Sequence, residues 1–408
     1  MSERISIPSR AKQKLDVIEG SLTLGRHTVV EGTGAPPKVR VSGTIYCEGH
    51  NVFECNIEAA DFEGEDDVTI RGNLTIEKNV DLEDGRLEVF GNLTARRVDV
   101  DRELYVDGDL HVEEVDVGGS LRVKGQVDAT KIDVGGSFEA KGKVVTERVD
   151  VGGSVLIESD VKITEVDVGG TARVGGGRIC KVDVGGSFES TKSLEFDRID
   201  VGGTVRLADK SKGGDVDVGG SLTTEGELEF QSIEVGGKVE IKGSGTGFKM
   251  EVGGKAQIDG RLVLSEDLEV GGRIEAREEI SARNIDVGGT LTAKKATAQQ
   301  RIEIGGSIET TQGVFASFVE IGSRGRIAGP TKADQIIVGK NARVENILGR
   351  RILMKSGAYA ENVYGEDLVI EYGCHINGEI KYTGSLRIDR NVSLAKEPEK
   401  VDTLPQSV

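Results

Sequence analysis

The sequence predicts an all-β fold, a single-stranded triangular β-helix (a β-solenoid) in which each coil of about 17 residues stacks on the previous one. Three observations predict it. A Val-Gly-Gly phrase recurs at a nearly constant interval, apolar residues recur at a spacing of two, and residues 38–329 contain no proline. Proline cannot donate to a β-ladder and paired glycines break helices, so strands are favoured throughout.

The Val-Gly-Gly phrase sets the length of a coil. Of the fourteen gaps between its anchor residues, twelve are 17 residues, one is 16 and one is 18. A coil this short cannot bury its own apolar face, so successive coils must stack. The anchors are Val100, Val117, Val134, Val151, Val168, Val184, Val201, Val218, Val235, Val252, Val270, Val287, Ile304, Ile321 and Val338.

A single coil shows where the strands and corners fall. Between Val115 and Val134 the apolar residues form pairs spaced by two, and the pairs are separated by four, four and three residues. This spacing describes three short strands joined by three corners. The glycine pair marks one corner, where we expect positive φ; no GxxxxGK[ST] phosphate loop is present.

The regularity of the phrase divides the chain into five parts. The expected parts are a flexible N-terminal tail (1–14), irregular N-terminal coils (15–99), the regular Val-Gly-Gly array (100–338), C-terminal coils with a changed phrase (339–394) and a disordered C-terminal tail (395–408). A turn or insertion is expected at residues 34–37, where two prolines follow Gly34 and Ala35.

Charge and composition exclude some classes of protein. The net charge is −18 and aromatic residues are 4% of the chain, which argues against nucleic-acid binding. No apolar run reaches the roughly 20 residues of a membrane span, and the N-terminus lacks a secretory signal, so a cytoplasmic location is expected. Cysteine usage favours buried thiols over a disulfide framework, at Cys47, Cys55, Cys180 and Cys374.

An acidic face is predicted beside the anchors, because the residue before each anchor is acidic in fourteen successive coils. These carboxylates would either bind a cation or partner, or form a solvated face that keeps neighbouring molecules apart. Basic residues two positions earlier offset part of their repulsion, at Lys131, Arg148, Lys181, Arg198, Lys249 and Arg301. The acidic residues are Asp99, Asp116, Asp133, Asp150, Asp167, Asp183, Asp200, Asp217, Glu234, Glu251, Glu269, Asp286, Glu303 and Glu320.

We assign no catalytic, cofactor-binding or metal-binding residue. The segment with Cys47, His50 and Cys55 lacks a fourth ligand and a familiar zinc spacing, so buried thiols are the preferred interpretation. Hexapeptide-type acyltransferases are the enzymatic alternative because their coils are similar. That chemistry would depend on His111 or His375 alone, and no constellation of base, nucleophile and oxyanion donor is visible.

The C-terminal coils resemble the bactofilins, the polymer-forming cytoskeletal proteins. The resemblance rests on VEIGSRGRIAG (319–329), IIVGKNARVEN (336–346), ILMKSGAYAEN (352–362) and LVIEYGCHING (368–378), and covers roughly residues 319–390. It implies a right-handed triangular β-helix that polymerises end to end without a nucleotide, and that reaches membranes or partners through short terminal tails.

The sequence therefore predicts a non-catalytic structural protein that assembles into a cytoskeletal filament or scaffold by docking of coil on coil at its ends. Expected partners are copies of the chain itself and other cytoskeletal or cell-envelope proteins, with peripheral contact to a membrane left open. The alternative is a rigid monomeric platform that recruits partners through its tails or acidic face. Candidate end residues are Leu15, Val17, Leu22, Leu24, Leu368, Ile370, Ile376, Leu386 and Ile388.

Overall fold

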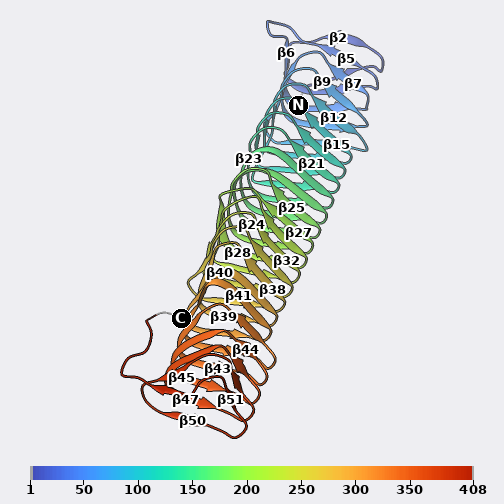
Figure 1. Cartoon of the computed structure of the whole chain (residues 1–408). Coiled ribbons are helices and arrows are strands. Elements are labelled where there is room, and N and C mark those ends of the chain that lie inside the picture. Colours follow the sequence, from blue (N-terminus) through green and yellow to red (C-terminus); the bar gives the residue numbers. More distant parts are fainter. Residues whose placement is uncertain (1–2, 407–408) are drawn as a thin grey trace. The chain divides into compact units, whose positions relative to one another are not determined.

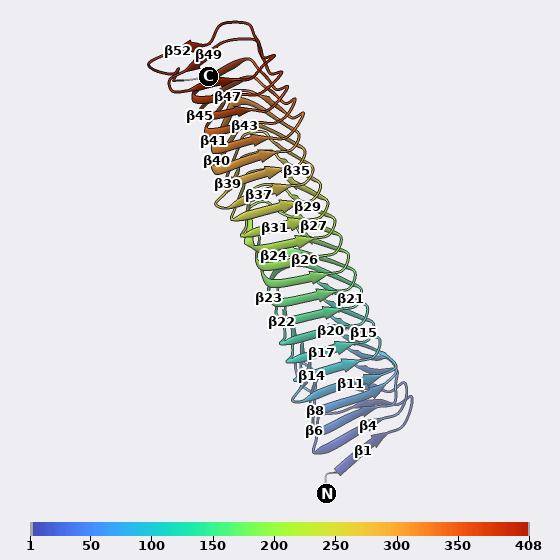
Figure 2. The same cartoon turned by 90° about the horizontal axis from the view of Figure 1, so that it is seen from below.

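The computed structural model describes residues 3–406, and these residues contain strands and no helix. The chain divides into two compact units, unit 1 (residues 1–203) and unit 2 (residues 204–408). Each unit is a β-solenoid whose strands pair in parallel with strands about 17 residues away, as predicted. Figure 1 shows the successive turns within each unit, and Figure 2 shows one row of parallel strands face on.

Each turn contributes to three faces. The anchor face carries the strand that ends at the anchor residue, the second face follows the next corner, and the third face leads to the next anchor strand. In unit 1, Val117 lies opposite Val100 and Val134 on the anchor face, and Leu121 lies opposite Leu104 and Phe138 on the second face. The predicted register of one turn on the next is therefore confirmed.

The strands of unit 1 are distributed over these faces as follows. The anchor face holds β1 (Glu3–Ile7), β4 (Gly20–Leu24), β11 (Asn79–Glu83), β14 (Arg97–Val100), β17 (Glu114–Val117) and β20 (Lys131–Val134). The second face holds β2 (Lys12–Lys14), β5 (Val29–Glu31), β7 (Asn51–Phe53), β9 (Val68–Ile70), β12 (Arg86–Val89), β15 (Glu103–Val106), β18 (Ser120–Val123), β21 (Ser137–Ala140) and β25 (Ser187–Ser190). The third face holds β3 (Val17–Ile18), β10 (Leu74–Ile76), β13 (Leu93–Thr94), β16 (Leu110–His111) and β19 (Val127–Asp128). Longer strands turn corners: β6 (Lys38–Cys47), β8 (Asn56–Glu65), β22 (Val144–Val151), β23 (Ser154–Val168), β24 (Thr171–Val184) and β26 (Leu194–Val201).

Unit 2 repeats this arrangement. Its anchor face holds β31 (Ser232–Val235), β34 (Lys249–Val252), β37 (Asp267–Val270) and β50 (Leu386–Ile388). Its second face holds β27 (Thr204–Leu207), β29 (Ser221–Thr224), β32 (Lys238–Ile241), β35 (Lys255–Ile258), β38 (Arg273–Ala276), β42 (Arg326–Ala328), β44 (Arg343–Val344), β46 (Tyr359–Ala360), β48 (His375–Ile376) and β51 (Ser393–Leu394). Its third face holds β30 (Leu228–Glu229), β33 (Gly245–Gly247), β36 (Leu262–Leu264), β49 (Ile380–Tyr382) and β52 (Glu399–Lys400). The strands that turn corners are β28 (Ser211–Val218), β39 (Glu279–Val287), β40 (Thr290–Ile304), β41 (Ser307–Ile321), β43 (Thr331–Val338), β45 (Asn346–Met354) and β47 (Asn362–Ile370).

The core of each unit consists of columns of apolar side chains that point inward from the three faces. On the anchor face of unit 1, Val98, Val115 and Ile132 are in register and fully buried. On the third face of unit 2 the column includes Gly245, and the neighbouring Gly247 has no room for a Cβ because the ring of Phe230 lies against it. A large side chain in one turn thus fills the space left by glycines in the next.

The glycine pairs of the array serve a different purpose from the one expected. None of them has φ in the left-handed region, so the expectation of positive φ is wrong. A Cβ added at Gly135 would overlap the carbonyl oxygen of Gly118, and one at Gly152 would overlap that of Gly135. The glycines are needed because the backbones of successive turns approach too closely at this corner for a side chain.

Positive φ is found at the equivalent corner of the turns outside the array. It occurs at the third residue after the anchor position at Arg10, His27 and His50 in unit 1 and at Asn341 and Gly373 in unit 2, and at the second residue at Asp66 and Asp84. Two kinds of corner therefore occur in this chain: a glycine pair in the regular array, and a corner with one left-handed residue in the turns near either terminus.

Two of the expected tails are part of the solenoid, and those expectations are wrong for the described residues. In the segment 1–14, β1 pairs with β4 and β2 pairs with β5. In the segment 395–408, β52 pairs with β49, and the Val401 amide donates to the Tyr382 carbonyl over 2.9 Å. Residues 1–2 and 407–408 lie outside the described part. The alternation in Arg4-Ile5-Ser6-Ile7 was too short to be distinguished from a polar tail. The turn expected at residues 34–37 is present, closed by an antiparallel bridge between Thr33 and Lys38.

Candidate functional site

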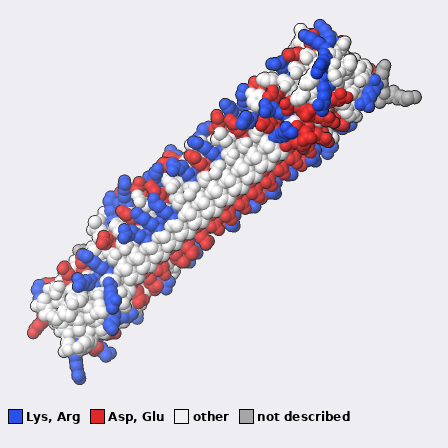
Figure 3. Space-filling view, turned by 90° about the vertical axis from the view of Figure 1, so that its right-hand side faces the viewer, with Lys and Arg blue, Asp and Glu red and all other residues white. Residues whose placement is uncertain are grey.

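The predicted acidic face exists as a column within each unit. In unit 1, strand pairing places Asp116 opposite Asp99 and Asp133, and the column continues in register as far as Asp200. In unit 2 the column begins at Asp217, which lies opposite Glu234, and continues to Glu320. Adjacent strands are roughly 4.8 Å apart, so neighbouring carboxylates repel each other. Figure 3 shows acidic side chains gathered in a row beside an uncharged band.

The column also extends toward the N-terminus beyond the predicted residues. Asp81 lies opposite Asp99 on one side and Glu63 on the other. Sequence reasoning missed both residues because their turns lack the Val-Gly-Gly phrase. The alternation of Val80, Asp81 and Leu82 carries the same signal, since Val80 and Leu82 are fully buried and Asp81 is exposed.

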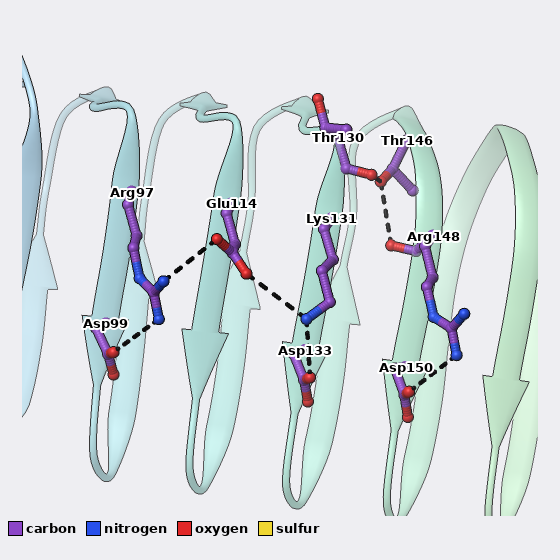
Figure 4. A network of polar contacts seen from close by, with 9 residues as sticks. All are labelled: Arg97, Asp99, Glu114, Thr130, Lys131, Asp133, Thr146, Arg148 and Asp150. Atoms are coloured by element: carbon purple, nitrogen blue, oxygen red, sulfur yellow. Dashed lines mark hydrogen bonds and ion pairs between the residues drawn. The ribbon is translucent and has the colours of Figure 1, made fainter.

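A second column of mixed charge runs beside the acids and neutralises many of them. It contains the residue two positions before each acid. In unit 1, Figure 4 shows Arg97, Glu114, Lys131 and Arg148 projecting side by side from successive turns. Lys131 lies 3.6 Å from Glu114 and 3.4 Å from Asp133. Lys131 therefore binds the acid of its own turn and also connects it to the preceding turn.

The ion pairs confirm five of the six predicted basic partners. Lys131, Arg148, Arg198, Lys249 and Arg301 each lie within 3.2–3.4 Å of the acid two residues later. Lys181 differs: its ammonium lies 2.8 Å from Glu165 in the preceding turn and lowers the pKa of that carboxyl. The sequence did not reveal this choice, because both carboxylates are within reach of the lysine's flexible chain.

Asp116 has no cation two positions earlier, because Glu114 occupies that position. Partial burial, followed by the charges of Asp99 and Asp133, raises the pKa of Asp116. Over residues 3–406, no group of three or more His, Cys, Asp or Glu side chains has an arrangement that could hold a metal ion. The ion pairs that Lys131 and Arg148 make with the column favour its interpretation as a solvated, partly neutralised face.

Most of the predicted end residues lie in the core, and the prediction that they form a docking surface is wrong for those. Leu22 and Leu24 are fully buried because β1 covers them, with Ile5 opposite Leu22 and Ile7 opposite Leu24. At the other terminus the last turn covers the remaining three, which are Leu368, Ile370 and Ile376. The sequence predicts that the residues of the terminal turns are tails or lie at the boundary of a tail. The predicted end surface therefore lies one turn inside the observed one.

The terminal turns expose the ends of the apolar columns. At the N-terminal turn, Ile5 is 38% exposed although its column is buried everywhere inward of it. Of the predicted residues, Leu15 is half-buried, and Val17 is 56% exposed but lies on the flank in register with Arg40. At the C-terminal turn, Leu386, Ile388 and Leu394 are half-buried ends of three inward columns. Only Leu386 and Ile388 therefore keep their predicted place at an end.

The strands of these terminal turns also have free edges. Within the described residues, β1, β2 and β3 pair only with β4, β5 and β6, and β50, β51 and β52 pair only with β47, β48 and β49. Each of these six strands thus has one edge whose backbone groups have no strand partner. Such edges are templates for pairing with another chain.

The histidines and cysteines occupy structural positions. His27 and His50 stack with ring centroids 4.9 Å apart because both occupy the left-handed corner of consecutive turns. His111 is exposed, with its Nε2 3.6 Å from Asp128, whereas His375 stacks on Tyr359 at 4.6 Å. All four cysteines are free thiols; three are buried as predicted, and Cys180 is half-exposed. Burial raises the pKa of Cys55 to about 11.

Comparisons of the chain with models of known protein families, with curated proteins and with solved structures find no match. Within residues 3–406 there is no helix long and apolar enough to cross a membrane. The fold and its class are thus defined by the structure alone: the chain is a β-solenoid protein.

Proposed function

We propose that this β-solenoid is a non-catalytic structural protein that assembles into a filament or scaffold by docking of one terminal turn on another. The observation that carries the proposal is the state of the two terminal turns. Each combines strands that are unpaired on one edge with apolar columns that end at the surface, at Ile5 in one turn and at Leu386, Ile388 and Leu394 in the other.

Two physical terms would act together in such a contact. Docked strands would complete backbone hydrogen bonds that the terminal turns leave open, in the manner of β-augmentation. The exposed ends of the columns would be removed from water, which contributes roughly 25 cal/mol per Å² of apolar surface. Neither term needs a nucleotide or a cofactor. The resemblance of residues 319–390 to the bactofilins is in accord with this proposal.

The alternative is a rigid platform that recruits partners through its tails or its acidic column. The structure supports this alternative less, since the described tail residues pack on the solenoid and ion pairs neutralise many of the column's acids. Under either proposal the protein acts in the cytoplasm or at a membrane surface, with other cytoskeletal or cell-envelope proteins as partners. An acyltransferase is not favoured, because His111 is exposed beside Asp128 and His375 is stacked on Tyr359.

Negative-stain electron microscopy tests the proposal directly. Purified protein at physiological salt should form filaments or end-joined particles whose number rises with protein concentration. Sedimentation velocity on the same samples should show a concentration-dependent increase in mass. Dispersed single particles at the highest concentrations, together with one constant sedimentation coefficient, would contradict end-to-end assembly and favour the platform.

A further inference from the structure

The third face of unit 2 carries an apolar patch on its outer side. One outward-pointing column there is formed by residues that are in register in successive turns, which are Thr297, Phe315, Lys332, Leu348, Tyr364 and Lys381. In unit 1 the corresponding outward column contains His111, Asp128, Val145, Lys162 and Arg178. Phe315 and Leu348 are therefore unusual at positions that normally face water.

Leu348 is only 7% exposed although it lies between the outward residues Lys332 and Tyr364. The C-terminal segment, residues 402–405, lines the same groove as Leu348, and its Leu404 and Pro405 are half-buried. Figure 1 shows the red end of the chain leaving the last turns and returning alongside unit 2.

The groove is larger than the segment that lies in it. With the segment in place a cavity of about 740 Å³ remains between it and unit 2, and the lining continues past Leu348 over three further turns, to Lys332, Phe315 and Gln299. Its lining carries the cations Lys332 and Arg350 and the acids Asp334 and Glu366, with Arg350 Nε 3.5 Å from Glu366, and the segment adds the carboxylate of Asp402. The apolar lining at Phe315 and Leu348 therefore fits a short, extended peptide with a Leu-Pro pair, and the balanced charges add no preference for an acidic one.

The attachment of the segment is also light. After β52, the last backbone hydrogen bond found in the described part of the tail is the one from Val401 to Tyr382. Beyond it the segment is held by the two half-buried apolar side chains. A segment held in this way can leave its groove and be replaced by an identical one, which is the low-cost route to exchange between identical chains.

We propose that this groove, here called the tail groove, is a second self-association site whose partner is the C-terminal segment of another copy of the chain. It goes beyond end-to-end docking and does not depend on it, since it lies on the flank of unit 2. Within one molecule the tail occupies its own groove, because tethering gives a high effective concentration. Exchange with a neighbour would link molecules side by side.

A peptide-binding measurement tests the groove in the full-length chain. The probe is a fluorescent peptide with the sequence of residues 399–408. The variant Leu404→Asp should release the chain's own tail and bind the peptide saturably, whereas the wild-type chain should bind it at least tenfold more weakly because its own tethered tail competes for the groove. Gln406→Asp is the matched control: it adds the same charge at an exposed position of the tail and should behave as wild type.

Adding Leu348→Glu to Leu404→Asp should abolish peptide binding. The solenoid should tolerate glutamate at position 348, because it would lie beside Lys332 and charged residues occupy outward columns elsewhere. Unchanged β-sheet circular dichroism would show that the double variant is folded. Equal peptide binding by the wild-type chain, the single variant and the double variant, or binding by none of them, would overturn the tail groove.

A complementary pair of variants tests the second copy as the occupant. Leu348→Glu has a free tail and a blocked groove, whereas Leu404→Asp has a free groove and a disabled tail. With each protein labelled by a different dye, energy transfer should rise in the mixture of these two and exceed that in a mixture of two double-variant samples. Assembly at the terminal turns would contribute equally to both mixtures. No difference between them, despite binding of the peptide, would overturn the link between copies.

Discussion

Arg148 and Glu165 lie opposite each other in neighbouring turns of unit 1, and Arg148 Nη1 is 3.3 Å from Glu165 Oε2. The other end of the same guanidinium, Nη2, is 3.4 Å from Asp150 in its own turn. One cation therefore offsets an acid of the column and also connects two turns. Arg97 makes the same two kinds of contact, and so does Lys131, so the acidic column is best understood together with its neighbour.

Removing the cation at position 148 should lower stability slightly. Arg148→Gln leaves Asp150 and Glu165 without this partner, and we expect a loss of up to about 1 kcal/mol at low salt, the usual size for exposed pairs. The loss should shrink as salt increases, because exposed charges are screened. Thermal unfolding at low and high salt measures it. Lys162→Gln is the control. It removes the same charge from the outer side of β23, and Lys162 forms no ion pair with another described residue. Equal effects at both positions would show that the pairs contribute nothing.

Removing the charge of Asp116 should raise stability at neutral pH. Its pKa is raised in the folded chain, first by partial burial and then by Asp99 and Asp133, so the charged form is favoured less in the folded than in the unfolded chain. Asp116 therefore costs stability above its raised pKa, and the cost vanishes below the ordinary value of 3.8. We expect Asp116→Asn to increase the free energy of unfolding at pH 7 by at most about 1 kcal/mol, which raises the melting temperature. Near pH 3 we expect no effect.

Asp133→Asn is the matched control for this titration. Asp133 occupies the next position of the same column but has the Lys131 ammonium 3.4 Å away. The substitution should leave the melting temperature at pH 7 unchanged or lower it. A rise as large as that of Asp116→Asn would mean that the column repels as a whole and that the neighbouring cations do not offset it.

The register of the solenoid could be predicted because a single period governs the inward side chains. Val98, Val115 and Ile132 lie one above another, as their common distance from the anchors indicated. The ends could not be placed in this way. Ile5 and Ile7 form a terminal strand on β4, but their turn has no Val-Gly-Gly phrase, and a five-residue strand next to Pro8 resembles a polar tail in composition.

The contacts between turns were predicted less well than the turns themselves. Lys181 reaches Glu165 rather than Asp183, and tail residues 402–405 line the same groove as Leu348, which is more than fifty residues earlier in the sequence. Both depend on how flexible or extended groups settle on a surface, and no periodic signal encodes that choice. The glycine pairs show a further limit of sequence analysis. A sequence does not distinguish a glycine that is required because φ is positive from one that is required because a neighbouring backbone leaves no room for a side chain.

The glycines of the array should tolerate no side chain. Gly135→Ala would place a Cβ against the carbonyl oxygen of Gly118, and the backbone would have to move, so we expect a loss of roughly 1–3 kcal/mol. Urea unfolding measures it. Gly373→Asn is the control, since Gly373 has φ of +70° but nothing within 4 Å of an added Cβ, and asparagine tolerates this conformation. A larger loss for Gly373→Asn than for Gly135→Ala would contradict the explanation by space.

The thiols should differ in their reaction with a soluble disulfide reagent. Cys47, Cys55 and Cys374 are buried, and burial raises the pKa of each, which keeps the thiols protonated and inaccessible. Cys180 is half-exposed. We expect one fast-reacting thiol per native chain, lost in Cys180→Ser, and four in denaturant. Fast reaction of any thiol in native Cys180→Ser would show that the solenoid opens at one of the buried cysteines.

Charged residues at the terminal turns should weaken assembly while similar changes on the flank should not. Ile388→Lys places an ammonium at the surface end of the inward column that continues from Ile370, where docking would bury it at a high cost in free energy. Val369→Lys is the matched control, because Val369 is 36% exposed on the side of the preceding turn.

At the other terminus, Ile5→Lys is paired in the same way with Leu156→Lys, since Leu156 is 38% exposed on the flank of unit 1. Sedimentation velocity over a range of concentrations should show the self-association of both end variants weakened at least tenfold, and the flank variants should match the wild-type chain. If Val369→Lys or Leu156→Lys impaired assembly as strongly as the end variants did, contacts between flanks would be responsible instead of the free strand edges of the terminal turns.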